Sequence, residues 1–258
     1  MSTVVLVTGA SRGLGLAISK ACLLQNAKVY GVGRSAIEAL PAVQLLLQEY
    51  PSSFFYQTAD LAIPGVPKQI VLACAAHFGS IGALVHNAGT LNPLARVIDM
   101  DLTALRQLME VNVFAGIEMV QCALPMLRNA DATSGLAGRV VMVSSGAALK
   151  AYEGWIPYCI SKSAINMFVE GLAAEEPLVT CVAIRPGVVD TDMQQTIRNE
   201  GGSVMAASDY SKFIQMKESG ELLSAEIPGA AIAKVAIHGT TGLSGKFINW
   251  NDPAINAL

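Results

Sequence analysis

The opening 24 residues constrain the fold more than any other part of this chain. A β-branched apolar run over 3–8 predicts a buried strand, and the amphipathic stretch behind it predicts a helix. Between them lie Gly9, Gly13 and Gly15, a GxxxGxG arrangement. Glycines permit positive φ and a close approach of backbone to phosphate, and a helix start offers free N–H groups to an anion. Strand, turn and helix in this order favour a nucleotide site; a tight strand-to-helix turn without a ligand is the alternative.

The second predicted strand, KVYGVG, ends at Arg34, 19 residues after Gly15. An Asp or Glu near this place holds the ribose 2′-hydroxyl in proteins that bind NAD, whereas this chain has a cation there. Arg12 in the glycine loop is a second cation, and with the Ser11 hydroxyl the two guanidinium groups would suit a 2′-phosphate. We therefore predict NADP(H) rather than NAD(H). The alternative is that Arg34 is a solvated loop charge.

Strands and helices alternate through the rest of the chain. Further strands are expected at SFFYQTADL, IGALVHNAG, VVMVS, LVTCVAIR and GKFIN, with helices near 37–50, 68–78, 102–127, up to 175 and 229–237. Hydrophobic residues make up 52% of the 258 residues and charged residues 14%, which fits a parallel sheet covered on both faces. No linker or repeat interrupts the pattern. We predict a single α/β domain over 1–258, a doubly wound Rossmann fold with about seven parallel strands.

Charge and composition exclude several classes of protein. The net charge of −3 argues against a nucleic-acid surface. No apolar run approaches the roughly 18 residues of a spanning helix, and the N-terminus resembles no signal peptide, so a cytoplasmic protein is expected. The five cysteines are odd in number and contain no CxxC pair, and the three histidines have no metal-binding spacing. We expect reduced thiols and no metal.

A hydroxyl, a phenol and an ammonium group lie between Ser144 and Lys162. Tyr158 and Lys162 are four residues apart, so a helix projects them from one face. Ser145 ends the strand VVMVS, and the three groups would converge at the sheet's carboxyl edge, where open α/β sheets bind ligands. Together they suit acid catalysis on a carbonyl; the Tyr–Lys pair taken alone would be an ordinary surface pair. Ser144 is expected to be structural.

Other residues are expected at the same edge. Asp60 follows the third strand, where it would accept from an adenine amino group or cap the next helix. Asn87, Ala88 and Gly89 end the fourth strand, where small residues let a cofactor lie against the backbone. Asn112 is surrounded by apolar residues in mid-helix, either as a packing polar group or as part of a proton and water network.

Two further features concern the substrate. The segment 190–224 loosens into short helical pieces before the last strand, and we predict that it forms a lid over the pocket. Trp155 lies between the strand and the catalytic helix. It is either a lining residue of the substrate pocket or a core aromatic residue.

Taken together, these motifs resemble the short-chain dehydrogenase/reductase family over almost the whole chain. The matching residues are TGASRGLG, NAG at 87–89, Asn112, SS at 144–145, Tyr158-x-x-x-Lys162 and PG at 186–187. Ser145 precedes Tyr158 by 13 residues, the family's usual interval. The resemblance implies an NADP(H)-dependent oxidoreductase acting on CH–OH or C=O groups. It also implies a homodimer or homotetramer formed through the helices that carry Asn112 and Tyr158.

The resemblance further implies a role for each matching residue. Tyr158 would give a proton to the carbonyl oxygen and Ser145 would orient that oxygen. Lys162 would lower the pKa of the phenol and hold the nicotinamide ribose, and Asn112 would hold a water that links Lys162 to solvent. The cofactor site would comprise Gly9, Ser11, Arg12, Gly13, Leu14, Gly15, Arg34, Asp60, Leu61, Asn87, Ala88, Gly89, Tyr158, Lys162, Pro186, Gly187, Val189, Thr191 and Met193.

Residues 144–195 carry a narrower likeness. The runs SSGAALKAYEGWIPYCISKSA, AAEEP and PGVVDTDMQQ are similar to sepiapterin reductases and fungal benzil reductases, both NADPH-dependent carbonyl reductases. Sepiapterin reductases anchor the pterin with a carboxylate near the C-terminus, and Asp252 has a similar position, although Asn-Asp-Pro is also an ordinary turn. The predicted substrate contacts are Ser145, Trp155, Tyr158 and Asp252.

We therefore predict a reductase of a ketone or dicarbonyl, either sepiapterin-like or benzil-like. The alternatives are a catalytically silent NADP(H)-sensing regulator and a methyltransferase. A methyltransferase would have no use for four of these residues, which are Tyr158, Lys162, Ser145 and Arg34.

Overall fold

A computed structural model describes residues 2–129 and 137–258. Within them seven strands form one parallel sheet, in the order β3-β2-β1-β4-β5-β6-β7. The strand order reverses between β1 and β4, which is where doubly wound sheets bind ligands. The predicted fold is confirmed. The strands are β1 (Val4–Thr8), β2 (Lys28–Gly33), β3 (Phe54–Thr58), β4 (Ala83–His86), β5 (Arg139–Val143), β6 (Thr180–Arg185) and β7 (Phe247–Asn249).

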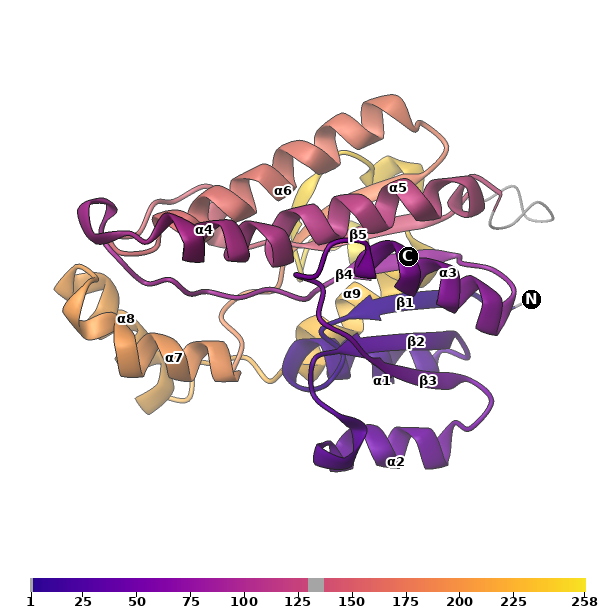
Figure 1. Cartoon of the computed structure of the whole chain (residues 1–258), viewed down its shortest axis with the longest axis horizontal. Helices are drawn as coiled ribbons and strands as arrows, with labels where there is room; N and C mark the ends of the chain where they lie inside the picture. The colour runs from indigo at the N-terminus through magenta and orange to yellow at the C-terminus, as the bar shows by residue number, and fades with distance from the viewer. Residues whose placement is uncertain (1, 130–136) are drawn as a thin grey trace.

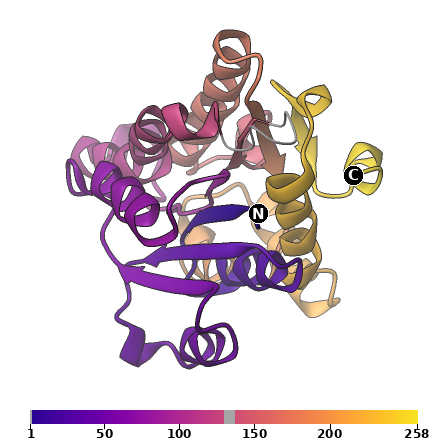
Figure 2. The same ribbon diagram turned by 90° about the vertical axis from the view of Figure 1, so that its right-hand side faces the viewer.

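Helices cover both faces of this sheet (Figure 2). Successive strand residues point to opposite faces, so Val5 and Val7 enter one apolar cluster while Leu6 enters the other. The first cluster includes residues of α1 (Gly13–Leu24), α2 (Pro41–Glu49) and α9 (Glu226–His238). The second includes residues of α3 (Val66–Phe78), α5 (Ala115–Leu127) and α6 (Ile156–Glu175). This double burial explains why the strands are apolar throughout.

The helix expected near 37–50 is interrupted. A 3₁₀ turn spans Ile37–Ala39, and α2 begins only at Pro41. Proline fits the first turn of a helix, where its missing N–H leaves no bond unmade, but it would break a helix that ran through it. The single helix predicted there was therefore wrong.

The long helix expected at 102–127 is also irregular. It consists of α4 (Leu102–Met109), a π-helical turn over Glu110–Phe114 and α5. The N–H of Ala115 bonds to the carbonyl of Glu110, five residues back instead of four. Such π turns inside α-helices are frequently found at functional sites. This one contains Asn112.

The segment 190–224 contains two helices, α7 (Asp192–Glu200) and α8 (Ala207–Glu218). Both lie beyond the carboxyl ends of the strands, apart from the layers that cover the sheet (Figure 1). Their apolar residues Ile197 and Phe213 join Trp155 and Tyr158 in a third buried cluster. The segment therefore packs against the start of α6. No helix among residues 2–129 and 137–258 is long and apolar enough to cross a bilayer.

Candidate active site

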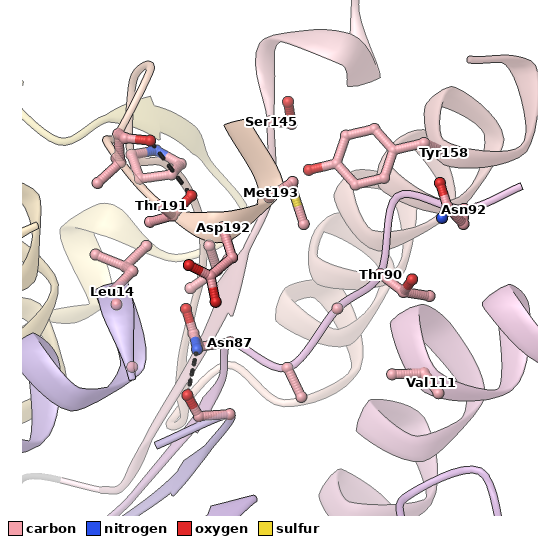
Figure 3. A pocket seen from close by; sticks show the side chains of 18 of the residues that line it. Leu14, Asn87, Thr90, Asn92, Val111, Ser145, Tyr158, Thr191, Asp192 and Met193 are labelled. Carbon is pink, nitrogen blue, oxygen red and sulfur yellow. Dashed lines mark hydrogen bonds between the residues drawn. The ribbon is translucent and has the colours of Figure 1, made fainter. Parts of the chain in front are cut away.

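A cavity of about 1080 Å³ lies at the carboxyl edge of the sheet, extending from the glycine loop to α8. Every residue predicted for the catalytic, cofactor or substrate site lines it except Asn112 and Asp252. Figure 3 shows contributions from the chain after β1, β4 and β5 and from the start of α7. Residues from both halves of the chain therefore share one site.

The glycine loop packs tightly on the end of β4. Gly9 has a φ of 67°, and a Cβ there would lie 2.8 Å from the Asn87 amide nitrogen. A Cβ at Gly15 would lie 2.1 Å from the Gly9 carbonyl oxygen, so no side chain fits. Asn87 Nδ2 donates to the carbonyls of Thr8 and Gly9, at 3.0 and 3.3 Å. The turn is thereby held beside the start of α1, whose free N–H groups favour an anion.

Two arginines line the cavity next to the glycine loop. Arg34 is exposed, and Arg12 Nε lies 2.9 Å from Asp192 Oδ2 at the start of α7. The ion pair joins the glycine loop directly to the segment predicted to be a lid. Asp60 lines the cavity too, but its Oδ1 also accepts from the N–H of Ala62 at 2.9 Å, so it closes a local turn as well.

Tyr158 and Lys162 lie one turn apart on α6 and are nearly enclosed, with exposed fractions of 7% and 4%. Lys162 Nζ donates to the carbonyl of Val143 at 2.8 Å and lies 5.6 Å from the centre of the Tyr158 ring. In Figure 3 the Tyr158 hydroxyl points into the cavity on the side of Ser145. The three groups predicted to converge are therefore brought to one place.

Burial sets the charge states of this pair. It raises the pKa of the Tyr158 phenol to about 12, against a hydrogen bond from Ser145 that acts in the opposite direction. Burial also lowers the pKa of the Lys162 ammonium to about 8. The net effect on the phenol pKa is thus a rise caused by burial, where a fall caused by Lys162 was expected. The phenol consequently keeps its proton and has the charge state of an acid.

The two neighbouring serines differ as expected. Ser144 is 1% exposed and its hydroxyl donates to Asn166 Oδ1 at 2.6 Å, so it ties β5 to α6. Ser145 lines the cavity, and its Oγ accepts from the N–H of Ala147 at 3.2 Å. That contact fixes the Ser145 side chain, while its proton stays available for donation.

Asn112 is fully buried behind the cavity wall, in the π turn. Its Oδ1 accepts from the N–H of Thr90 at 2.8 Å, and its Nδ2 donates to Thr90 O at 2.9 Å and Ser161 Oγ at 3.0 Å. The side chain thus fastens the loop after β4 to α6. Asn112 and Lys162 both lie beside Gly89, because a Cβ at Gly89 would be 3.4 Å from Asn112 Oδ1 and 3.6 Å from Lys162 Nζ. The water-holding role of Asn112 stays a prediction.

An aromatic wall closes the end of the cavity that was predicted to hold the substrate. Trp155 is 5% exposed and stacks on Phe213 of α8, with ring centres 5.4 Å apart and planes 17° apart. Tyr152 lies 5.0 Å from Trp155. Trp155 therefore lines the cavity and also packs in the third cluster, and its contact with substrate stays a prediction. Phe213 was missed because nothing in the loose segment 190–224 distinguished a lining side chain.

Asp252 lies outside this cavity. Its Oδ1 accepts from the N–H of Ala254 at 2.9 Å and caps the short helix α10 (Pro253–Asn256), with Pro253 at the first helical position. The structure thus gives Asn-Asp-Pro its ordinary turn geometry instead of a substrate anchor. Among the described residues, no three His, Cys, Asp or Glu side chains group closely enough to hold a metal ion.

Comparison with known proteins agrees with this geometry. The family model for short chain dehydrogenase matches residues 3–201. An uncharacterized oxidoreductase of Saccharomyces cerevisiae is 39% identical over 259 residues, which cover 99% of this chain and 98% of that protein. The crystal structure of a short chain dehydrogenase/reductase from that yeast superposes with a TM-score of 0.90 at 38% identity, covering 99% of both chains.

Two relatives have named activities. The benzil reductase ((S)-benzoin forming) of Saccharomyces cerevisiae is 35% identical over 269 residues, covering 100% of this chain and 99% of that protein. The sepiapterin reductase of Bos taurus is 32% identical over 236 residues, covering 87% and 86%. Similarity to the first extends over the full length of both chains.

Proposed function

Because the chain belongs to the short-chain dehydrogenase family, we propose that this oxidoreductase is an NADPH-dependent carbonyl reductase acting on ketones or dicarbonyls that carry a flat aromatic group. The observation that carries the proposal is the meeting of Ser145, Tyr158 and Lys162 at one end of a cavity whose other end is the glycine loop. An aromatic wall of Trp155 and Phe213 stands beside them. A regulator that only senses the cofactor would have no need of a buried phenol and ammonium.

The residues present fit a nicotinamide dinucleotide. The loop at Gly9 admits no side chain, and α1 begins beside it, which together make a cradle for phosphate. Gly89 and Lys162 lie further along the cavity, where the lysine would hold the nicotinamide ribose. When bound, the dinucleotide supplies a hydride to the carbonyl carbon.

The chain's own residues supply the proton and the orientation. Ser145 donates to the carbonyl oxygen and stabilises the charge that develops on it. Tyr158, kept protonated by its burial, transfers its proton to the same oxygen as that charge grows. Lys162 then favours the phenolate that remains, and the phenolate regains a proton from solvent past Asn112.

Arg34 and Arg12 support NADPH over NADH. A 2′-phosphate brings two negative charges to the loop, and Arg34 is exposed at the cavity edge where a planar fork of donors meets it. Arg12 is shared with Asp192 and contributes less. Binding of the 2′-phosphate therefore depends mainly on Arg34.

The substrate end supports an aromatic diketone over a pterin. Three aromatic side chains, Tyr152, Trp155 and Phe213, line the cavity there. The carboxylate considered as a pterin anchor, Asp252, caps α10 away from the cavity. A benzil-like diketone presents flat rings to that wall and needs no anchoring carboxylate.

Absorbance at 340 nm tests the proposal directly. The purified protein is mixed with NADPH and, in separate reactions, benzil, sepiapterin and the aliphatic diketone 2,3-butanedione. We expect the highest kcat/KM with benzil, and a value with NADPH at least tenfold above that with NADH, a ratio that Arg34→Ala lowers. Tight NADPH binding without turnover of any carbonyl would indicate the sensing regulator. An equal or greater kcat/KM with NADH would contradict the role of Arg34.

We also propose that the protein forms a homodimer or homotetramer through the outer surfaces of the helices around Asn112 and Tyr158. Phe114, Ile160 and Met167 are large apolar side chains with exposed fractions of 49%, 46% and 66%. Covering them would remove this area from water. Sedimentation of the wild type and of Met167→Glu tests the proposal: a smaller species is expected for the variant, and a monomeric wild type would contradict it.

A further inference from the structure

His86 is a buried imidazole with no part in the chemistry derived above. It ends β4, directly before the Asn87–Ala88–Gly89 turn, and is 2% exposed. A buried polar ring of this kind needs a partner at each nitrogen. Both partners are present: Thr8 Oγ1 lies 3.2 Å from Nδ1, and the carbonyl oxygen of Val111 lies 3.1 Å from Nε2.

Counting donors determines which nitrogen carries the proton. Thr8 Oγ1 already accepts the N–H groups of Asn87 and Ala88, at 3.1 and 3.0 Å. Its single hydrogen therefore goes to Nδ1 of His86, which must be unprotonated. The proton of the neutral ring is on Nε2 and is donated to Val111 O. Burial lowers the pKa of His86 to about 4, with the Lys162 ammonium as the charged group that acts on it in the same direction, so the ring stays neutral.

The bond from His86 Nε2 goes to the carbonyl of Val111, which lies in the π turn. In an α-helix the N–H of Ala115 would bond to Val111 O, but here it bonds to Glu110 O. His86 supplies a donor to the carbonyl that Ala115 has left. Gly116 makes room for the ring, because a Cβ there would lie 2.8 Å from His86 Cδ2 and 2.7 Å from Met142 Cε.

Each of the two bonds therefore leads to a different part of the site. Through Thr8 the imidazole reaches the N–H groups of Asn87 and Ala88, on the turn that packs against the glycine loop. Through Val111 it reaches the residue before Asn112, whose side chain holds Thr90. Figure 3 shows Asn87 and Thr90 on the chain after β4, with Val111 on the neighbouring helix.

We propose that His86 is a positioning residue with two separate roles. Through Thr8 it holds the segment Asn87–Ala88–Gly89 beside the glycine loop, and through Val111 it holds the π turn that contains Asn112. The inference rests on the proposed function only for its effect on turnover. Its effects on cofactor affinity and on Asn112 are independent of the substrate.

Two substitutions separate the two bonds. In His86→Asn the side-chain oxygen takes the place of Nδ1 and still accepts from Thr8, but nothing reaches Val111. In His86→Gln the amide nitrogen takes the place of Nε2 and still donates to Val111, but the acceptor for Thr8 is lost. Both replacements are polar and neutral. The control is His77→Asn, a histidine on α3 that is exposed and does not line the cavity.

Three readouts are needed: Kd for NADPH by fluorescence titration, kcat at saturating NADPH, and hydrogen exchange of the Thr90 amide, which donates to Asn112. We expect His86→Gln to raise Kd five- to tenfold and to change kcat less than twofold, since one hydrogen bond of ordinary strength is lost. We expect His86→Asn to lower kcat five- to tenfold and to speed Thr90 exchange, with Kd changed less than twofold. The control should alter none of the three.

Equal changes in Kd and kcat for both variants would overturn the proposal, as would a fall in Tm with no change in any readout. A wild type that binds NADPH but reduces no carbonyl would contradict the proposed function instead. In that case Kd and Thr90 exchange still decide whether His86 positions the two turns.

Discussion

The two sides of the cavity are held by different kinds of interaction. On the cofactor side, Lys162, Asn112 and His86 are at most 4% exposed and bond to backbone groups of other segments. On the substrate side, α7 and α8 bury Ile197 and Phe213 in an apolar cluster with Trp155, and they form ion pairs in which at least one side chain is 48% or more exposed. The pairs are Arg12–Asp192, Lys217–Asp190 and Lys150–Asp209.

The difference has an energetic consequence. Leaving a buried polar group without its partner costs about 1–3 kcal/mol, whereas an exposed ion pair contributes about 0–1 kcal/mol. The polar groups on the cofactor side therefore depend on specific partners, whereas on the substrate side the ion pairs contribute little and the apolar packing of Phe213 on Trp155 holds the wall.

Among substitutions on the cofactor side, Lys162→Met should lower kcat the most. It removes the ammonium that favours the phenolate left by proton transfer, and we expect kcat to fall about 10²–10⁴-fold. Steady-state kinetics with benzil measures the loss. Lys217→Met, on the substrate side, is the matched control and should change kcat less than twofold. A fall in kcat of less than tenfold for Lys162→Met would show that residues on the two sides of the cavity contribute comparably to turnover.

Acid should destabilise the cofactor side through His86. Its pKa is about 4 when folded, against about 6.5 when unfolded, so the unfolded state binds the extra proton first. Stability is full above pH 6.5 and falls between pH 6.5 and 4, by up to ~3 kcal/mol. Urea unfolding across this window measures it. His86→Asn should lose less stability over the same window, and an identical pH dependence in both proteins would contradict the assignment.

Phe213→Ala tests the substrate side. It removes the ring that stacks on Trp155, and an aromatic pair contributes about 0.5–1.5 kcal/mol beyond the area it buries. We expect kcat/KM for benzil to fall about three- to tenfold while that for 2,3-butanedione changes less than twofold. Parallel kinetics with the two diketones is the measurement. Equal losses for both would mean that the aromatic wall does not select substrates.

Asp190→Asn should have the smallest effect. Its carboxylate pairs with Lys217 at 2.7 Å, and both side chains are nearly half exposed. Solvent screening leaves such a pair at most about 1 kcal/mol, so thermal unfolding should shift by only a few degrees. A shift of more than about ten degrees would show that this exposed pair contributes far more than solvent screening allows.

The sequence was sufficient for the parts of the molecule governed by periodicity and by local motifs. The parallel sheet follows from apolar strands alternating with helices. The places of Ser145, Tyr158 and Lys162 follow from strand and helix geometry, because Tyr158 and Lys162 are one turn apart and Ser145 ends a strand. The residues predicted for the cofactor site after each strand line the cavity for the same reason, since they all lie at one edge.

The rest depends on contacts between segments that are distant in the chain. His86 gave no signal, because its partners Thr8 and Val111 are 78 and 25 residues away. The π turn at Asn112 has an unremarkable apolar sequence around it. Phe213 joins the site because α8 brings it against Trp155, the residue directly before α6. Asp252 resembled a substrate anchor by position alone, and its carboxylate caps the helix that follows it.

The central claim is that Tyr158 donates the proton to the substrate, and that the affinity for NADPH does not depend on the Tyr158 hydroxyl. Tyr158→Phe tests this claim with two measurements on one protein: turnover of benzil at 340 nm and Kd for NADPH by fluorescence titration. We expect kcat to fall about 10²–10⁴-fold with Kd within about twofold of the wild type. Turnover near the wild-type rate in this variant would contradict the account.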